Sequence, residues 1–98
     1  MAFEIHRRAL ADGIAAYRYY ARISPQLAAR FMLELDDTID RVDRMPQAWP
    51  KHIRGTRFYR FPSYPYRLIY IERATDILIL AITHHARNPL YWQRRLKN

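Results

Sequence analysis

Residues 66–83 read YRLIYIERATDILILAIT and hold two apolar strands joined by a short link. Residues 66–71 and 76–83 are rich in β-branched and aromatic side chains, a composition that favours strands. The link at residues 73–76 is short enough to make them an antiparallel hairpin. Because the second strand is apolar on both faces, we expect it to be central in its sheet and covered on both sides.

A third strand is expected upstream of this hairpin, at residues 57–61. The Pro-containing segment 62–65 interrupts it as a turn, and two further prolines mark an irregular connection at residues 46–50. Downstream, residues 84–89 should leave the sheet, and residues 90–96 should form one or two helical turns.

Two helices are predicted in the first half of the chain, at residues 9–22 and from Gln26 to about Met45. Ser24 is a good N-cap and Pro25 suits the first helical position, so the second helix should begin there. The short turn between the helices makes them an antiparallel hairpin. The first helix carries apolar residues at three- and four-residue spacing that should share a face: Leu10, Ile14, Tyr17 and Ala21.

The order of these elements predicts an α+β fold with a single domain over residues 1–98. It comprises a short N-terminal strand at residues 3–6, the helical hairpin, a three-strand antiparallel meander and a short basic C-terminal tail. We expect the hairpin to pack on one face of a small antiparallel sheet. Because two helices cover only one face, the other face needs a cover, or it exposes an apolar patch that would suit a partner.

The composition narrows the class of protein. The chain has 98 residues, with 17 Lys and Arg against 9 Asp and Glu, a formal net charge of +8, and no Cys. Without Cys there is neither a disulfide framework nor a thiolate metal site. No apolar run reaches the roughly 18–20 residues of a membrane span, and the first residues lack the apolar stretch of a signal peptide. We therefore expect a cytoplasmic protein with no membrane partner. Its positive charge favours an anionic partner.

Basic and aromatic side chains interleave from Lys51 onward, a pattern that suits either nucleic-acid binding or a solvated outer face of the sheet. The residues expected to contact a target or nucleic acid are Lys51, Arg54, Arg57, Arg60, Trp92, Arg94 and Arg95. His84 and His85 are neighbours on a strand, so they point to opposite faces and cannot jointly chelate one ion. The carboxylates of the second helix should form a solvated face paired with Arg. The sequence predicts neither a metal site nor a cofactor.

Three stretches make the chain resemble the RelE/ParE superfamily of toxins from type II toxin–antitoxin systems. Residues 61–70 resemble the family's Tyr-Arg strand, with Tyr66-Arg67 in the corresponding place. Residues 77–84 resemble its apolar strand that ends in His. Residues 87–95 are similar to the Arg-x-Pro-x-Tyr-Trp-x-x-Arg tail of many members. The resemblance covers nearly the whole chain and implies a compact fold of strand, helical hairpin and sheet.

The resemblance also implies a cytoplasmic toxin whose partner is a cognate antitoxin, ParD-like or RelB-like and acidic. RelE-like members cleave mRNA on the ribosome, and ParE-like members inhibit DNA gyrase. If the chain is a ribonuclease, the resemblance implies that its catalytic residues are Arg67, His85, Arg87 and Tyr91. The basic cluster is rich in Arg and poor in Lys, and Arg is a poor general base. We therefore prefer gyrase inhibition over mRNA cleavage, with a non-toxic binding module of the same fold as a third alternative.

Overall fold

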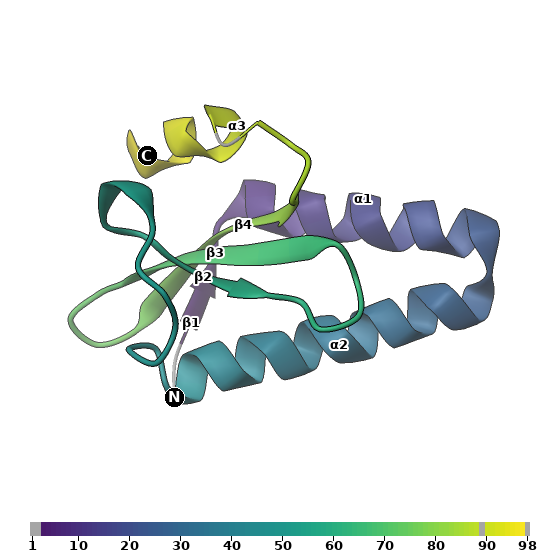
Figure 1. Cartoon of the computed structure of the whole chain (residues 1–98), viewed down its shortest axis with the longest axis horizontal. Coiled ribbons are helices and arrows are strands. Elements are labelled where there is room, and N and C mark those ends of the chain that lie inside the picture. Colours follow the sequence, from purple (N-terminus) through teal and green to yellow (C-terminus); the bar gives the residue numbers. More distant parts are fainter. Residues whose placement is uncertain (1–2, 89, 98) are drawn as a thin grey trace.

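Residues 3–88 and 90–97, which the computed structural model describes, form two long helices, a four-stranded sheet and a short C-terminal helical segment (Figure 1). Pro89 of the tail motif lies outside the described residues. The elements are β1 (Phe3–Ile5), α1 (Arg7–Ile23), α2 (Pro25–Arg44), the 3₁₀ helix η1 (Ile53–Gly55), β2 (Arg57–Arg60), β3 (Tyr66–Glu72), β4 (Ile77–His84), α3 (Leu90–Gln93) and the 3₁₀ helix η2 (Arg94–Lys97). The predicted α+β fold and its order of elements are confirmed. No helix in the described part of the chain is both long and apolar enough to cross a membrane.

The sheet is mixed, with the strand order β1-β4-β3-β2. β2, β3 and β4 form the predicted antiparallel meander, in which Tyr66 pairs with His84. β1 runs parallel to β4, with Ile5 opposite Ile79, so the expectation of a wholly antiparallel sheet is wrong. The meander leaves one edge of β4 free, and the N-terminal strand pairs with that edge. β4 is therefore a central strand, as its apolar pattern predicted.

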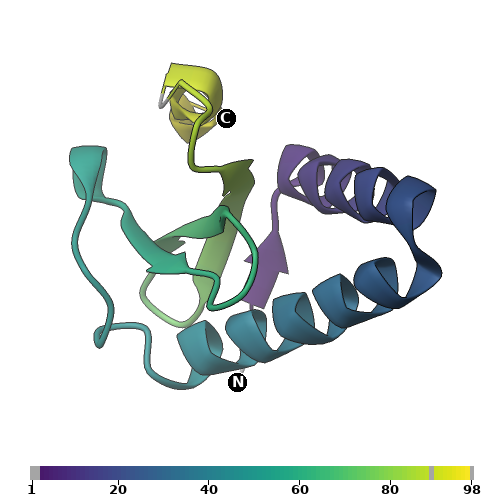
Figure 2. The ribbon, with the colours of Figure 1, turned by 45° about the vertical axis from the view of Figure 1, so that its right-hand side comes forward.

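The helical hairpin turns at a single residue. Ser24 follows α1 and caps α2, because its Oγ accepts from the backbone N–H groups of Gln26 at 3.2 Å and Leu27 at 3.4 Å. Pro25 takes the first position of α2, where no backbone N–H is needed. Figure 2 shows both helices on one side of the sheet and the C-terminal segment away from them.

α1 packs on the sheet through small side chains. Its buried residues are Ala9, Gly13 and Ala16. A Cβ added at Gly13 would lie 3.5 Å from Ile82 Cδ1, so helix and strand approach closely. The predicted apolar stripe lies on a different side of the helix, where Leu10, Ile14 and Tyr17 are 55%, 45% and 41% exposed. The close approach of the two backbones leaves room at the contact only for small residues, and the bulky ones remain in solvent.

The other face of the sheet is covered by the chain itself. Trp92 of α3 is 2% exposed and packs with Leu96 against Ile69, Leu80 and Ala81. The C-terminal segment is therefore the cover that we expected this face to need, and it leaves no open apolar patch over these residues.

Candidate functional site

A buried carboxylate ties the C-terminal segment to α1 and to the edge of β4. The side chains of Asp12 and Arg95 are 6% and 5% exposed, and Asp12 Oδ2 lies 2.6 Å from Arg95 Nη1. β1 ends at Ile5, so the later part of β4 has no strand partner on this edge. Asp12 Oδ2 accepts there from the backbone N–H of Ile82 at 3.1 Å, and Arg95 Nη1 donates to the Leu80 carbonyl at 3.0 Å. Two side chains thus complete the hydrogen bonding of an open strand edge.

Sequence reasoning missed Asp12 altogether. The signal that pointed to it was its isolation, since Asp12 is the only acidic residue in the otherwise basic α1. A lone carboxylate in such a helix is more easily explained by one buried partner than by a solvated acidic face.

Three residues predicted to bind a target or nucleic acid have partners inside the fold. Trp92 is buried on the sheet, and Arg95 belongs to the buried ion pair. Arg57 Nε lies 2.9 Å from Glu72 Oε1, and Arg57 Nη1 donates to the Trp49 carbonyl at 2.7 Å. In this structure the three side chains hold elements together and are not presented to a partner.

The remaining predicted binding residues are exposed: Lys51, Arg54, Arg60 and Arg94. They come from the loop before β2, from η1, from the end of β2 and from the start of η2. They are open to solvent but belong to four separate elements.

The structure brings together two of the four residues assigned to catalysis by the resemblance. The guanidinium carbon of Arg87 lies 4.2 Å from the centre of the Tyr91 ring. Arg67 is half-buried on β3 and stacks over an aromatic ring of β2. His85 is exposed, with its ring 5.0 Å from that of His84. Within the described chain, no hydrogen bond, ion pair or ring contact joins Arg67 or His85 to the Arg87–Tyr91 pair.

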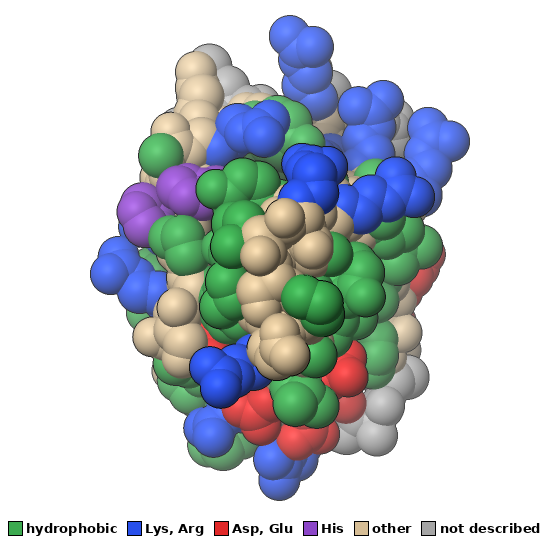
Figure 3. Space-filling model, turned by 90° about the vertical axis from the view of Figure 1, so that its right-hand side faces the viewer, with side chains coloured by type: hydrophobic (Ala, Val, Ile, Leu, Met, Phe, Trp, Pro, Cys, Tyr) green, Lys and Arg blue, Asp and Glu red, His purple; other side chains and the backbone are tan. Residues whose placement is uncertain are grey.

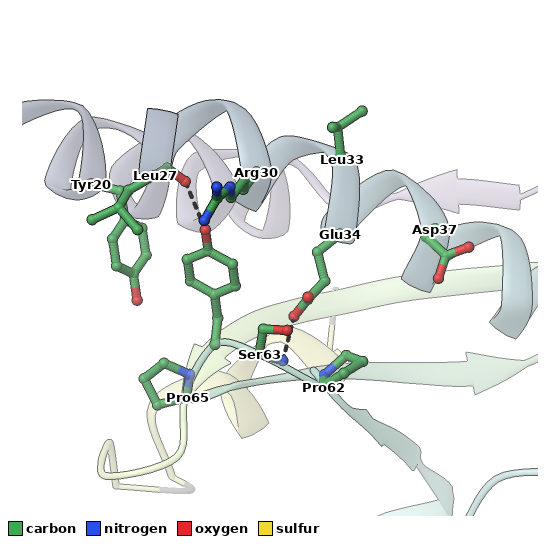
Figure 4. A pocket seen from close by; sticks show the side chains of 10 residues that line it. Tyr20, Leu27, Arg30, Leu33, Glu34, Asp37, Pro62, Ser63 and Pro65 are labelled. Carbon is green, nitrogen blue, oxygen red and sulfur yellow. Dashed lines mark hydrogen bonds between the residues drawn. The ribbon is translucent and has the colours of Figure 1, made fainter. Parts of the chain in front are cut away.

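A cleft of about 690 Å³ lies between α2 and the turn before β3 (Figure 4). The Tyr64 hydroxyl donates to the Leu27 carbonyl at 2.8 Å, and the Ser63 N–H donates to Glu34 Oε2 at 2.9 Å. These bonds attach the turn to the helix. Asp37 and Arg30 also line the cleft, so the charges at its wall are of both signs.

The exposed stripe of α1 forms one wall of an apolar groove, which we call the hairpin groove. It has a volume of about 260 Å³, and its lining is entirely apolar. The lining residues come from α1, α2, β1 and β4: Ile5, Ala9, Leu10, Gly13, Ile14, Tyr17, Met32, Leu35, Ile39 and Ile82. A surface of this kind suits the apolar face of another chain.

A polar crevice lies on the nearly opposite side of α1, and we call it the tyrosine crevice. Two adjoining hollows of about 280 and 610 Å³ share Tyr19, Tyr66, His84 and Arg87. Arg22 lines the smaller hollow. Burial raises the pKa of Tyr66, and the neighbouring Tyr19 raises it further, so the Tyr66 hydroxyl keeps its proton at neutral pH.

Charge is distributed unevenly over the molecule. On the face in Figure 3, the larger group of Lys and Arg side chains lies in the upper part, while Asp and Glu side chains lie mainly in the lower part with further Lys and Arg side chains beside them. On α2, Arg41 and Arg44 pair with Asp37 and Asp40 at 2.9 and 2.6 Å, which confirms the predicted solvated, paired face at these positions. For Asp43 the prediction is wrong, because this carboxylate is buried at 8% exposure. Among residues 3–88 and 90–97, no three His, Asp or Glu side chains are grouped so that they could hold a metal ion.

The family model for the ParE toxin of the type II toxin–antitoxin system parDE matches residues 3–89. Among solved structures, the chain resembles one from a chromosomal ParDE toxin–antitoxin system of P. aeruginosa, with a TM-score of 0.69 and 23% sequence identity. The match covers 86% of this chain and 95% of that chain, and at this identity it shows a shared fold. No curated protein matches the chain. The extent of the family match means that the chain belongs to the ParE toxin family of type II toxin–antitoxin systems.

Proposed function

We propose that the chain is a single-domain toxin that arrests growth. A cognate antitoxin neutralises this toxin by occupying the hairpin groove. The observation that carries this proposal is the groove itself, a wholly apolar hollow between two helices of a ParE family member. Monomeric proteins seldom leave large apolar surfaces open, and those that do usually have a partner. An antitoxin is the partner that membership of a toxin–antitoxin family suggests.

The shape and charge of the molecule favour an amphipathic, acidic antitoxin segment. Leu10, Ile14 and Tyr17 stand about one helical turn apart, which matches the spacing of the apolar residues on a partner helix. Apolar contacts in the groove would supply most of the affinity. The net charge of +8 would attract an acidic segment and speed its encounter with the toxin.

The double variant Leu10→Asp/Ile14→Asp tests the groove. Both side chains are about half exposed, so the variant should fold, yet it places two carboxylates in an apolar contact. We expect antitoxin binding to weaken by at least about 100-fold, measured by calorimetry with the purified cognate antitoxin. Leu33→Asp is the matched control, because Leu33 is 70% exposed and lies outside the groove. Equal affinity of the double variant and the control would contradict the proposal.

For the target, we propose DNA gyrase, inhibited without covalent chemistry, rather than ribosome-bound mRNA. RNA cleavage needs a base for the 2′-hydroxyl, a cation for the phosphorane and an acid for the leaving oxygen. The Tyr91 hydroxyl already donates to Asp12 Oδ1 at 3.0 Å, so its proton serves the fold. Arg67 has no contact with Tyr91 in the described chain. Both observations support a non-enzymatic toxin.

The two targets separate in paired assays. Purified protein is added to DNA supercoiling by gyrase and to ribosome-dependent cleavage of mRNA. We expect supercoiling to stop while the mRNA stays intact, and the reverse outcome would reject gyrase. A third experiment expresses the chain in bacteria under a regulated promoter without the antitoxin. Unchanged growth would reject the hypothesis that the chain is toxic and favour a non-toxic binding module.

A further inference from the structure

We propose that the tyrosine crevice binds single-stranded nucleic acid, with Arg22 and Arg87 on the phosphates and Tyr19 and Tyr66 against a base. This site differs from the hairpin groove: the two adjoin at Ile82, but no residue of α1 lines both. It therefore stands independently of the antitoxin and gyrase proposals.

The free charge in the crevice is positive. Asp12 is its one acidic lining residue in the described chain, and both of its oxygens are occupied by donors that include the Arg95 guanidinium. Arg22 and Arg87 are exposed, and neither forms an ion pair within residues 3–88 and 90–97. Two unpaired guanidinium groups beside a neutralised carboxylate favour an anionic ligand.

Aromatic rings stand beside these cations. Tyr19 is 52% exposed, and its ring is held by an edge-to-face contact with Tyr20 at 5.2 Å. Tyr66 is half-buried and meets His84 edge to face at 5.3 Å. It also packs against Phe31 and Phe61 of the core, so part of its ring lines the crevice. Fixed rings next to a positively charged groove are the combination by which proteins bind single strands, because every base has a face that can stack.

The turn that carries Arg87 is held in place. The backbone N–H of Ala86 donates to His84 Nδ1 at 3.1 Å, and that of Arg87 donates to the His84 carbonyl at 2.9 Å. The guanidinium then stacks on Tyr91, which further limits its freedom. The larger hollow, about 610 Å³, lies within the range of roughly 300–1,000 Å³ that small-molecule sites occupy, so it can accept a nucleotide.

An acidic peptide is the competing ligand. It would pair with the same arginines but would gain little from the tyrosine faces, because carboxylates do not stack. The contribution of Tyr19 therefore distinguishes the two ligands, and the crevice favours nucleic acid because both kinds of group line it.

Fluorescence anisotropy with labelled oligothymidylate and oligouridylate, each about ten nucleotides long, tests the proposal on the full chain. Tyr19→Ala should weaken binding about tenfold, and Tyr19→Phe, which keeps the ring, should bind like the parent protein. Arg87→Ala should weaken binding and should reduce the slope of log K against log salt by about 0.7.

Two substitutions serve as matched controls. Tyr17→Ala removes an exposed tyrosine from the hairpin-groove side of α1, and Arg30→Ala removes an exposed cation from α2, outside the crevice. Each should change the affinity by less than about twofold. Near-UV circular dichroism checks that every variant is folded.

Three results would overturn the proposal. The first is no binding of either oligonucleotide, and the second is equal losses in the crevice variants and their controls. The third is binding of a labelled oligoglutamate that falls in Arg87→Ala but not in Tyr19→Ala, which would assign the crevice to acidic peptides. Binding of either oligonucleotide with losses confined to the crevice variants supports it.

Discussion

Replacing Asp12 by Ala should lower the free energy of unfolding by about 3–5 kcal/mol. The variant leaves the Arg95 guanidinium, 5% exposed, without its counter-charge, and a buried unpaired charge costs about that much. It also removes the acceptor for the Ile82 N–H and the Tyr91 hydroxyl. Since small domains have a total stability of about 5–15 kcal/mol, the loss would be a large fraction of the whole.

Urea unfolding followed by tryptophan fluorescence measures this loss. The chain has two tryptophans, so a Trp49→Phe background leaves Trp92 as the reporter for the C-terminal segment that the ion pair anchors. The matched control is Asp37→Ala, which breaks an ion pair on the exposed surface of α2 and should cost less than about 1 kcal/mol.

A second variant separates the cost of an unpaired buried charge from the loss of packing. Asp12→Ala/Arg95→Met should be more stable than Asp12→Ala alone, because it leaves no charge buried on the sheet. The reasoning is refuted if Asp12→Ala loses no more stability than the Asp37→Ala control.

Three further substitutions follow from the packing, and urea unfolding measures each. Gly13→Ala should raise the free energy of unfolding by about 0.5–1 kcal/mol, since the added methyl would meet Ile82 and Leu35 at ordinary contact distances; a loss would show that α1 cannot accept it. Trp92→Ala should cost about 3–5 kcal/mol and open the outer face of the sheet to a hydrophobic dye, whereas unchanged stability would mean that the segment is loosely attached. Burial, together with the nearby Arg67, lowers the pKa of His52 from 6.5. As the pH falls, the unfolded chain therefore binds a proton at a higher pH than the folded chain does, and the free energy of unfolding should fall below about pH 6.5. His52→Gln should reduce that slope, and an unchanged slope would exclude His52 as its source.

Much of the fold was predictable because its signals are local. The N-cap at Ser24 followed by Pro25 located the start of α2, and the apolar pattern of residues 77–82 indicated a central strand. The pairing of β1 was not predictable, because a three-residue strand carries no information about the direction of a partner more than 70 positions away.

The candidate site was less predictable than the fold. Trp92 and Arg95 carry the same residue types that bind nucleic acid, and only their burial shows that they serve the fold. Leu10 and Ile14 read as core residues of an amphipathic helix but line an open groove. Residue type and spacing do not report which side of a helix meets the sheet.

The sequence by itself determined the α+β class, the order of the elements, the helical hairpin and the resemblance to the toxin superfamily, because each depends on residues near one another in the chain. Only the tertiary structure decided which side of α1 is buried, how the outer face of the sheet is covered and where the free positive charge lies. The ion pair between Asp12 and Arg95 shows the reason, since its members are 83 positions apart and only folding brings them together. In the folded chain Arg95 is buried and anchors the C-terminal segment, whereas Arg87 is exposed to solvent.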